Sequence, residues 1–308
     1  MVYIVDWLSF TTKKYSYETI IELLNLPMVN WSSIQGFYGY QYSLFYEGIR
    51  IHYNDDKNGC FVNFSGQGCR TFETISPLDW YWLFEMLTME EDEFNITRID
   101  VACDEKDGIL PLKKIADITN KFIAGDTENV CTKFSWADVN NSSQGLSVYY
   151  GSPKSDIRVR IYDKAAERGL ADQHWIRVEL QIRNNLAKNM ILSILHLKDV
   201  GKSFCGVVNN YIRFIKIDHT RKEKCSFLQW WSRFVQTAEK IKIFISVGVE
   251  YNLQRIENYL NNQVGNSLQT YVKCKDGVID DLMKIITKPR NLSKKQKDLI
   301  ISYTEGEG

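Results

Sequence analysis

Polar and apolar residues alternate along several short stretches of the chain, whereas elsewhere apolar residues recur every three or four positions. Alternation is typical of β-strands, and the wider spacing is typical of helices. Residues 3–10 (YIVDWLSF) predict a strand, and residues 17–26 predict a helix that Ser16 can cap. Residues 38–65 are rich in Tyr, Phe, Ile and Val and are interrupted at Glu47-Gly48, which indicates strands joined by hairpins. A helix is expected after Ser76-Pro77.

A second cycle of the same order follows. Residues 96–104 (ITRIDVACD) predict a strand, and Pro111 opens a helix that Gly125 closes. Further strands are expected at about 131–138, 146–150, 157–163 and 175–182, followed by a helix over about 185–197. The segments VDWLSF and RIDVAC would be the matching first strands of a duplicated unit. The identity between the halves is slight, so the pattern leaves the duplication open.

After residue 200 the pattern becomes helical. Phe227, Trp231 and Phe234 share a helical spacing, which continues through residues 249–264 and 282–286. We therefore expect an α+β fold with a mainly antiparallel sheet and helices on one face. Residues 1–200 would form the main domain, as one unit or as two tandem related units (1–93 and 94–200), and 201–308 a smaller helical region.

Charge is divided unevenly between the two ends of the chain. The formal net charge is zero, with 38 basic and 38 acidic residues, but residues 1–184 hold 18 Lys and Arg against 26 Asp and Glu. The basic surplus in the remainder would suit a polyanion, although such a division is also common without function. The seven cysteines are scattered, and no apolar run is long enough to span a bilayer. We therefore predict a cytoplasmic protein that does not contact membranes.

Three predicted strands carry polar residues at every second position, so that these residues line one side of a sheet. These residues are Arg98, Asp100 and Asp104 in the first strand, Arg158, Arg160, Tyr162 and Lys164 in the second, and Arg177, Glu179, Gln181 and Arg183 in the third. If the three strands are neighbours, two carboxylates, a phenol and several cations converge on one open face. The alternative is a solvated sheet face with weak cross-strand ion pairs.

This combination of side chains would suit chemistry on a phosphodiester. Asp100 and Glu179 could hold Mg²⁺ or Mn²⁺, which prefer oxygen ligands. The Tyr162 hydroxyl could attack phosphorus, although a phenol with a pKa of about 10 needs nearby positive charge at neutral pH. Lys164 and the arginines could supply that charge and hold flanking phosphates.

The sequence resembles the Rep_trans family of replication initiators from rolling-circle plasmids and phages, and the related relaxases of integrative conjugative elements. The matching pieces cover about residues 1–200 and occur in the family's order: GFYGYQYSLFYEGIRIHY (36–53), FSGQGCRTFE (64–73), TRIDVACD (97–104), VYYGSPKSDIRVRIYDKAAE (148–167) and WIRVELQIR (175–183). The His-hydrophobic-His motif of the wider rolling-circle superfamily is absent, because the four histidines are scattered.

The resemblance implies a metal-dependent DNA nickase and ligase that initiates rolling-circle replication or conjugative transfer through a covalent 5′-phosphotyrosine intermediate. It places the nucleophile at Tyr162, with Lys164 and Arg160 as further catalytic residues. Asp100 and Glu179 map onto metal ligands, and we add Asp104 as a third candidate. The predicted DNA contacts are Arg98, Arg158, Arg177, Arg221 and Lys222.

The implied partners are an origin that presents its nick site as a hairpin or single strand, a host helicase and a second copy of the chain in a homodimer. Two other functions stay open from the residues. One is a non-catalytic origin-binding protein on the same scaffold. The other is a phosphodiesterase or nuclease that uses water as nucleophile. The GQGC stretch at 66–69 predicts a bulged turn and not a phosphate-binding loop, since no helix is expected directly after it.

Overall fold

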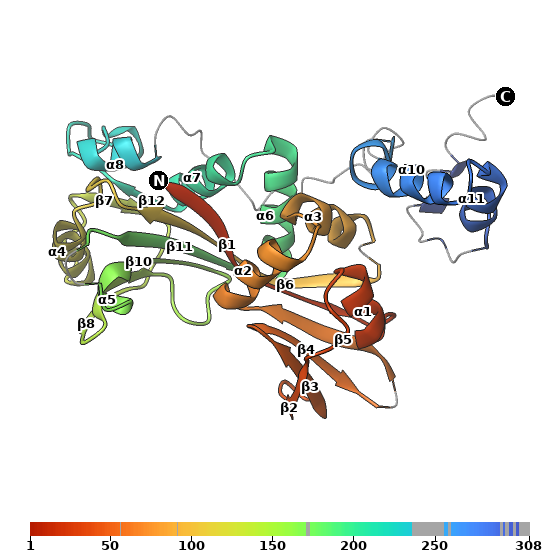
Figure 1. Ribbon diagram of the computed structural model, residues 1–308. Helices are drawn as coiled ribbons and strands as arrows, with labels where there is room; N and C mark the ends of the chain where they lie inside the picture. Colours follow the sequence, from red (N-terminus) through yellow and green to blue (C-terminus); the bar gives the residue numbers. More distant parts are fainter. Residues whose placement is uncertain are drawn as a thin grey trace.

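A ten-stranded antiparallel sheet forms the centre of the protein in a computed structural model (Figure 1). The structure describes residues 1–55, 57–90, 92–170, 173–235, 256–257 and 260–289, and positions 292, 296–297 and 300–301. The strand order is β2-β3-β4-β5-β1-β6-β11-β10-β9-β8. The strands are β1 (Val2–Thr12), β2 (Ser32–Gln35), β3 (Tyr42–Tyr46), β4 (Ile49–Asn54), β5 (Lys57–Phe64), β6 (Phe94–Glu105), β8 (Ala137–Ser142), β9 (Gly145–Tyr150), β10 (Ile157–Asp163) and β11 (Ile176–Arg183).

Helices cover the apolar face of this sheet and leave the polar face open. The helices between and after the strands are α1 (Tyr17–Leu23), α2 (Gly66–Ile75), α3 (Trp80–Met89), α4 (Leu112–Ile123), α5 (Lys164–Glu167), α6 (Asn184–Leu197) and α7 (Val200–Tyr211). Ile99, Val101 and Leu180 are fully buried on the covered side, where α6 packs against β6 and β11. The predicted α+β fold with helices on one face is therefore confirmed.

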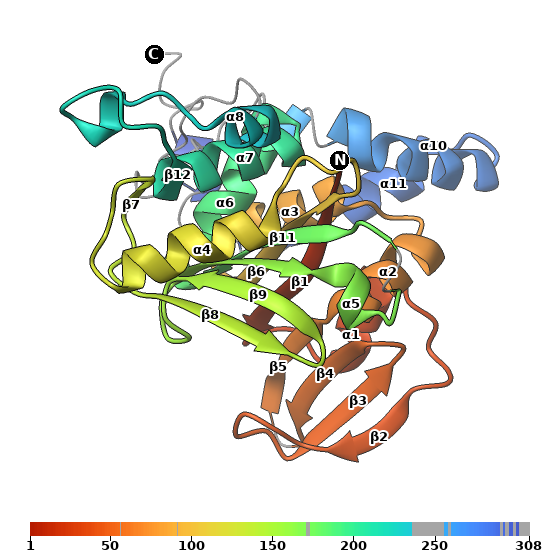
Figure 2. The same ribbon diagram turned by 90° about the vertical axis from the view of Figure 1, so that its left-hand side faces the viewer.

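The sheet repeats one topology on the two sides of its centre. From the central pair outward, one half runs β1, β5, β4, β3, β2 and the other runs β6, β11, β10, β9, β8. Because β1 and β6 pair antiparallel, the two halves are related by an approximate two-fold rotation. Figure 2 shows the strands fanning out on either side of β1 and β6. Each half also places its first helix directly after its central strand, which is the order that a duplicated unit would have.

Local signals in the sequence explain several element boundaries. The Ser16 side chain accepts a hydrogen bond from the Thr19 backbone amide at the start of α1, as predicted. Glu47 and Gly48 both have positive φ, at 42° and 88°, and form the tight turn between β3 and β4. The sequence also predicts a hairpin turn at Lys57-Asn58-Gly59, whereas these residues already belong to β5.

The prediction for GQGC was wrong, because these residues form the first turn of α2 directly after β5. Ser65 caps the helix and accepts a hydrogen bond from the Gly68 amide. The glycines are needed for packing, since a Cβ on Gly68 would lie 2.4 Å from the carbonyl oxygen of Gly48. The helix therefore sits directly on the β3–β4 turn, an arrangement that the composition of the segment concealed.

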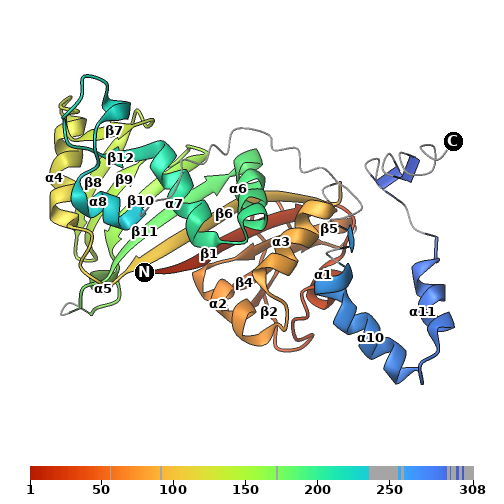
Figure 3. The same cartoon turned by 90° about the horizontal axis from the view of Figure 1, so that it is seen from above.

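Residues up to 235 share the core of the sheet domain. α7 contacts β1 and β6, the short strand β12 (Ile212–Phe214) pairs with β7 (Val130–Thr132), and α8 (Gln229–Val235) packs on α7 (Figure 3). Phe204, Phe214 and Trp231 are fully buried within this core. Residue 200, where the sequence predicts a domain boundary, is the first residue of α7. Because α7 packs on the sheet, residues 200–235 belong to the same core as the residues before them.

Further along the chain lie α10 (Gly265–Cys274) and α11 (Ile279–Ile286), which contact each other. The helical spacing predicted over 249–264 lies partly outside the described residues, whereas that over 282–286 falls within α11. Among the helices that are described, none is both long and apolar enough to cross a membrane.

Candidate active site

The three polar strand phases predicted from the sequence do lie side by side on the open face. β11 pairs with both β6 and β10, so that Glu179 lies opposite Arg160 on one side and Ala102 on the other. In the same registers Arg177 lies opposite Tyr162 and Asp104, and Gln181 lies opposite Asp100. The converging face that the alternation predicted is therefore a consequence of this strand order.

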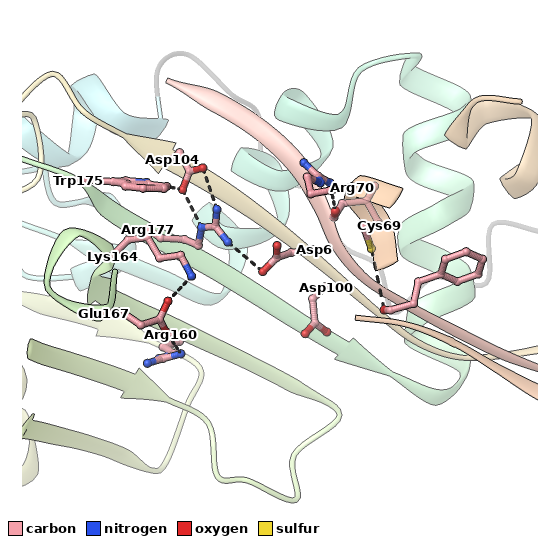
Figure 4. A network of polar contacts seen from close by, with 12 residues as sticks. Asp6, Cys69, Arg70, Asp100, Asp104, Arg160, Lys164, Glu167, Trp175 and Arg177 are labelled. Carbon is pink, nitrogen blue, oxygen red and sulfur yellow. Dashed lines mark hydrogen bonds and ion pairs between the residues drawn. The ribbon is translucent and has the colours of Figure 1, made fainter. Parts of the chain in front are cut away.

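Asp6 is a further acid at this site, and the sequence analysis missed it. The register of β1 against β6 shifts between Val5 and Trp7, so Asp6 occupies a β-bulge beside Asp100. Its carboxylate accepts a hydrogen bond of 3.1 Å from the Arg177 guanidinium (Figure 4). The one available signal was the comparison of VDWLSF with RIDVAC, because each segment holds a single aspartate, Asp6 in one and Asp100 in the other.

Asp100 is buried and Glu179 is partly buried, and the two carboxylates repel each other. Burial raises the pKa of Asp100 to about 6, while Arg98 opposes this rise with hydrogen bonds of 2.8 and 2.5 Å to the two carboxylate oxygens. Burial also raises the pKa of Glu179 to about 7, and the negative charges of Asp100 and Asp6 add to the rise. At the centre of the open face, repulsion between these acids therefore adds to the effect of burial.

Tyr162 lies beneath a layer of cationic side chains. Its side chain is buried, with 2% of the residue exposed, and the Arg160 guanidinium lies 3.7 Å from the centre of its ring. Burial raises the pKa of the Tyr162 phenol above its usual range, and the charge of Glu179 adds to this effect, whereas Arg177 lowers it. The phenol is thus close enough to Glu179 to be influenced by its charge, and its ionisation requires further positive charge.

Lys164 lies at the start of α5 and not on the β10 strand where the alternation placed it. β10 ends at Asp163, whose side chain caps the helix by accepting from the Ala166 amide. The Lys164 ammonium pairs with Glu167 and lies 5.5 Å from the centre of the Tyr162 ring. Glu167 also lies 3.6 Å from Arg160, so one carboxylate links both cations beside the phenol (Figure 4).

Asp104, predicted as a metal ligand, is engaged by other side chains. One carboxylate oxygen accepts from the Arg177 Nε and the Trp175 indole, at 2.7 and 2.8 Å, and the other accepts from Arg177 at 2.9 Å. These contacts lower the pKa of Asp104, although burial opposes them. Arg177, predicted as a DNA contact, is itself 6% exposed and is enclosed by Asp6 and Asp104. The ion pair between Arg177 and Asp104 links β11 to β6 and orients Arg177 toward Tyr162.

The other predicted DNA contacts differ in whether their side chains are already engaged by other groups of the protein. Arg98 pairs with Asp100 and lies over the Trp7 ring, 4.3 Å from its centre. Arg158 lies over Tyr149, also at 4.3 Å, on the open face. Lys222 donates to Thr127, whereas the neighbouring Arg221 is exposed. Arg158 and Arg221 are therefore the more available cations of the predicted set.

No group of three or more His, Cys, Asp or Glu side chains within the described part of the chain is arranged to hold a metal ion. His174, the one histidine near β11, contacts Glu105 at 3.0 Å. The donor set at the centre of the face nevertheless suits a hard divalent cation, because Asp6, Asp100 and Glu179 supply carboxylate oxygens whose negative charges act on one another.

Comparison with known proteins assigns the chain to a family. The family model Rep_trans, described as "Replication initiation factor", matches residues 94–286, and a model described as "Rolling Circle replication initiation protein N-terminal domain" matches residues 2–88. The first match covers more than half of the chain, so this protein belongs to the replication initiation factor family. The predicted rolling-circle initiation function is confirmed at this level.

Two individual proteins support the assignment. The chain is 26% identical to a Bacillus subtilis (strain 168) protein described as "Putative DNA relaxase NicK", over 98% of this chain and 90% of that protein. A solved structure of a rolling circle replication initiator protein from Geobacillus stearothermophilus has a TM-score of 0.67 and 28% identity. The match covers 78% of this chain and 97% of the chain in the solved structure.

Proposed function

We propose that the protein nicks one DNA strand at a specific origin site and retains the 5′ phosphate as an ester of Tyr162. The observation that carries the proposal is the position of this phenol: Tyr162 lies opposite Arg177 on the sheet face that also holds Glu179, two residues further along β11. In the chemistry proposed, the Tyr162 oxygen forms a bond to phosphorus and its proton passes to water. The bond from phosphorus to the 3′ oxygen breaks, and that oxygen takes up a proton to become a free 3′ hydroxyl.

The ester conserves the energy of the original phosphodiester, so the same site can rejoin ends. A 3′ hydroxyl that attacks the phosphotyrosine restores the DNA and releases the phenol, which takes back a proton. This reversal underlies the ligase activity in the proposal. It also distinguishes the protein from a nuclease, in which water would take the place of Tyr162 and no protein–DNA bond would form.

We further propose that Asp100 and Glu179, with Asp6 beside them, hold a divalent cation, Mg²⁺ or Mn²⁺. The raised pKa values of Asp100 and Glu179 support this assignment, since a cation would relieve the repulsion between them. When bound, the metal would polarise a phosphate oxygen and draw off developing negative charge. Asp104 is left out of this set because it accepts from the Trp175 indole as well as twice from Arg177, and these contacts lower its pKa. Asp100 accepts twice from Arg98, but its pKa is still raised.

Arg160 and Lys164 would stabilise the charge on the phosphate. In the absence of DNA both pair with Glu167 and lie over the Tyr162 ring. A phosphate oxygen can replace Glu167 as their partner, because the charge and the hydrogen-bonding geometry are alike. Entry of the scissile phosphate would thereby turn Arg160 away from the ring and expose the phenol.

The substrate in this proposal is an origin whose nick site is presented in a hairpin or single strand, since an unpaired strand reaches a sheet face more easily than a stacked duplex. Replication and conjugative transfer both begin with such a nick. The host helicase stays a prediction from the family resemblance, and the homodimer stays a prediction from the helical region after residue 200.

The test is nicking of a supercoiled plasmid that carries the origin of the element encoding the protein, with Mg²⁺ or Mn²⁺. We expect the wild-type protein to relax the plasmid and the Tyr162→Phe variant to have lost the activity by several orders of magnitude. Nicking that survives in Tyr162→Phe would refute the nucleophile. Binding without nicking by the wild-type protein would favour the non-catalytic origin-binding protein.

A further inference from the structure

The first half of the sheet contains a counterpart of the proposed active site. β4 and β5 occupy the positions in their half that β10 and β11 occupy in theirs. The sequence RIHY in β4 corresponds to RIYD in β10, which places Arg50 at the position of Arg160 and His52 at that of Tyr162. Arg50 lies opposite Asn63 of β5 just as Arg160 lies opposite Glu179 of β11.

The counterpart has replaced both groups that the proposed chemistry requires. The imidazole of His52 stands in place of the phenol, and the amide of Asn63 stands in place of the Glu179 carboxylate. With neither a phenol nor an acid, this half lacks the groups for strand cleavage by the mechanism proposed for Tyr162. It keeps the arginine, which can still bind a phosphate.

Two buried polar atoms in this counterpart have no hydrogen-bond partner. They are the Nε2 of His52, a residue 1% exposed, and the Oδ1 of Asn63, a residue 4% exposed. The other ring nitrogen of His52 is engaged with the Ser43 hydroxyl at 2.5 Å. An unpaired buried polar atom is destabilising, so two of them on neighbouring strands of one sheet face indicate a ligand with polar edges.

Aromatic residues cover the same spot and are largely exposed. The segment between β2 and β3 places Phe37 and Tyr38 against His52, with ring centres 6.4 and 5.7 Å from the imidazole. Tyr38 is 75% exposed and Phe37 is 53% exposed. Large exposed aromatic rings beside a cation are typical of surfaces on which unpaired bases stack.

This surface is continuous with the proposed active site. Along one row of the sheet, Arg50 lies opposite Asn63, Asn63 opposite Ser9, and Ser9 opposite Arg98. Arg98 in turn pairs with the metal-binding candidate Asp100. A strand bound at the active site can therefore extend over the first half without leaving the open face.

We propose that the open face of the first half binds an unpaired segment of the DNA strand that the second half cuts. Its bases stack on Phe37 and Tyr38, their polar edges meet His52 and Asn63, and Arg50 binds a phosphate. The proposal rests on the proposed function, because DNA is taken as the occupant on account of the neighbouring nicking site.

The test measures binding of fluorescently labelled oligo(dT) to the full chain carrying Tyr162→Phe, so that cleavage plays no part. We expect Tyr38→Ala and Phe37→Ala each to weaken binding of oligo(dT) by about tenfold, the loss expected for removal of one stacking partner. Binding of an oligo(dA)·oligo(dT) duplex should change less. The matched control is Tyr42→Ala, since Tyr42 contacts Tyr53 on the opposite, helix-covered face.

Oligo(dT) affinity that is the same in both variants as in the control would overturn the proposal. A second measurement does not depend on the folding of variants. Bromouracil-substituted oligo(dT) is crosslinked by light to the unsubstituted protein, and the attached peptide is identified by mass spectrometry. Attachment to the peptide with Phe37 and Tyr38 supports the proposal, and attachment only to other segments overturns it. Nicking of the supercoiled plasmid is scored separately, so failure of either proposal is recognised on its own.

Discussion

Glu179 is partly buried near Asp100 and Asp6, and this arrangement makes stability depend on pH. Its folded-state pKa is raised, so the folded protein binds a proton more tightly than the unfolded chain does. The contribution of Glu179 to stability is therefore fully present at pH values below the ordinary pKa of a carboxyl group. It is lost as the pH rises through neutrality. Asp100 acts in the same direction.

We expect Glu179 and Asp100 together to make the metal-free protein more stable to urea at pH 5.5 than at pH 8. The expected difference in the free energy of unfolding is about 1–3 kcal/mol. Glu179→Gln should reduce this difference, because an amide has no proton to lose. Added Mg²⁺ should raise the stability at pH 8 more than at pH 5.5. An unchanged pH profile in Glu179→Gln would show that Glu179 is not the titrating group.

Arg160 has two roles in the account, covering the phenol before DNA binds and stabilising phosphate charge afterwards. Arg160→Ala should reduce the nicking rate by about 10²-fold, which is typical for loss of one charge-stabilising donor. Arg160→Lys should recover part of the rate, since it keeps the charge but not the planar fork. Single-turnover nicking at saturating protein measures both, and equal rates in all three proteins would contradict the role of Arg160.

Between elements, the closest contact is that of α2 on the β3–β4 turn. Gly68→Ala should lower the free energy of unfolding by about 1–3 kcal/mol, because its Cβ would lie 2.4 Å from the Gly48 carbonyl oxygen and the backbone would have to move. The suitable control is Gly66→Ala at the start of the same helix, where the nearest atom, in the Asp6 side chain, lies 3.2 Å away. Urea denaturation compares the two, and equal stabilities would mean that α2 adjusts freely.

The same element shows where sequence patterns fail. Strands such as β10 and β11 were predictable, because alternation is a local property of each segment. α2 was missed, since its glycines suggest a turn while the packing that requires them comes from a distant hairpin. Asp6 was missed for a related reason: the bulge that turns it toward Asp100 exists only in the pairing of β1 with β6.

For the whole molecule, the two-fold repeat separates the roles of the halves. The second half carries the phenol and Glu179, while the first contributes Asp6 at the centre of the sheet and the aromatic surface farther out. Slight identity between the halves left the repeat undecided from the sequence. The structure shows the repeat, because the strand order and the pairing register are the same in both halves although most side chains differ.

Formation of a covalent bond between Tyr162 and DNA tests the account most directly. The protein is incubated with a single-stranded oligonucleotide that spans the nick site of its own origin, in the presence of Mn²⁺, and is then denatured and digested with trypsin. We predict that mass spectrometry will find the 5′-phosphorylated fragment attached to the peptide that contains Tyr162. A cleaved oligonucleotide with a free 5′ phosphate, or with its fragment attached to another tyrosine, would contradict the account.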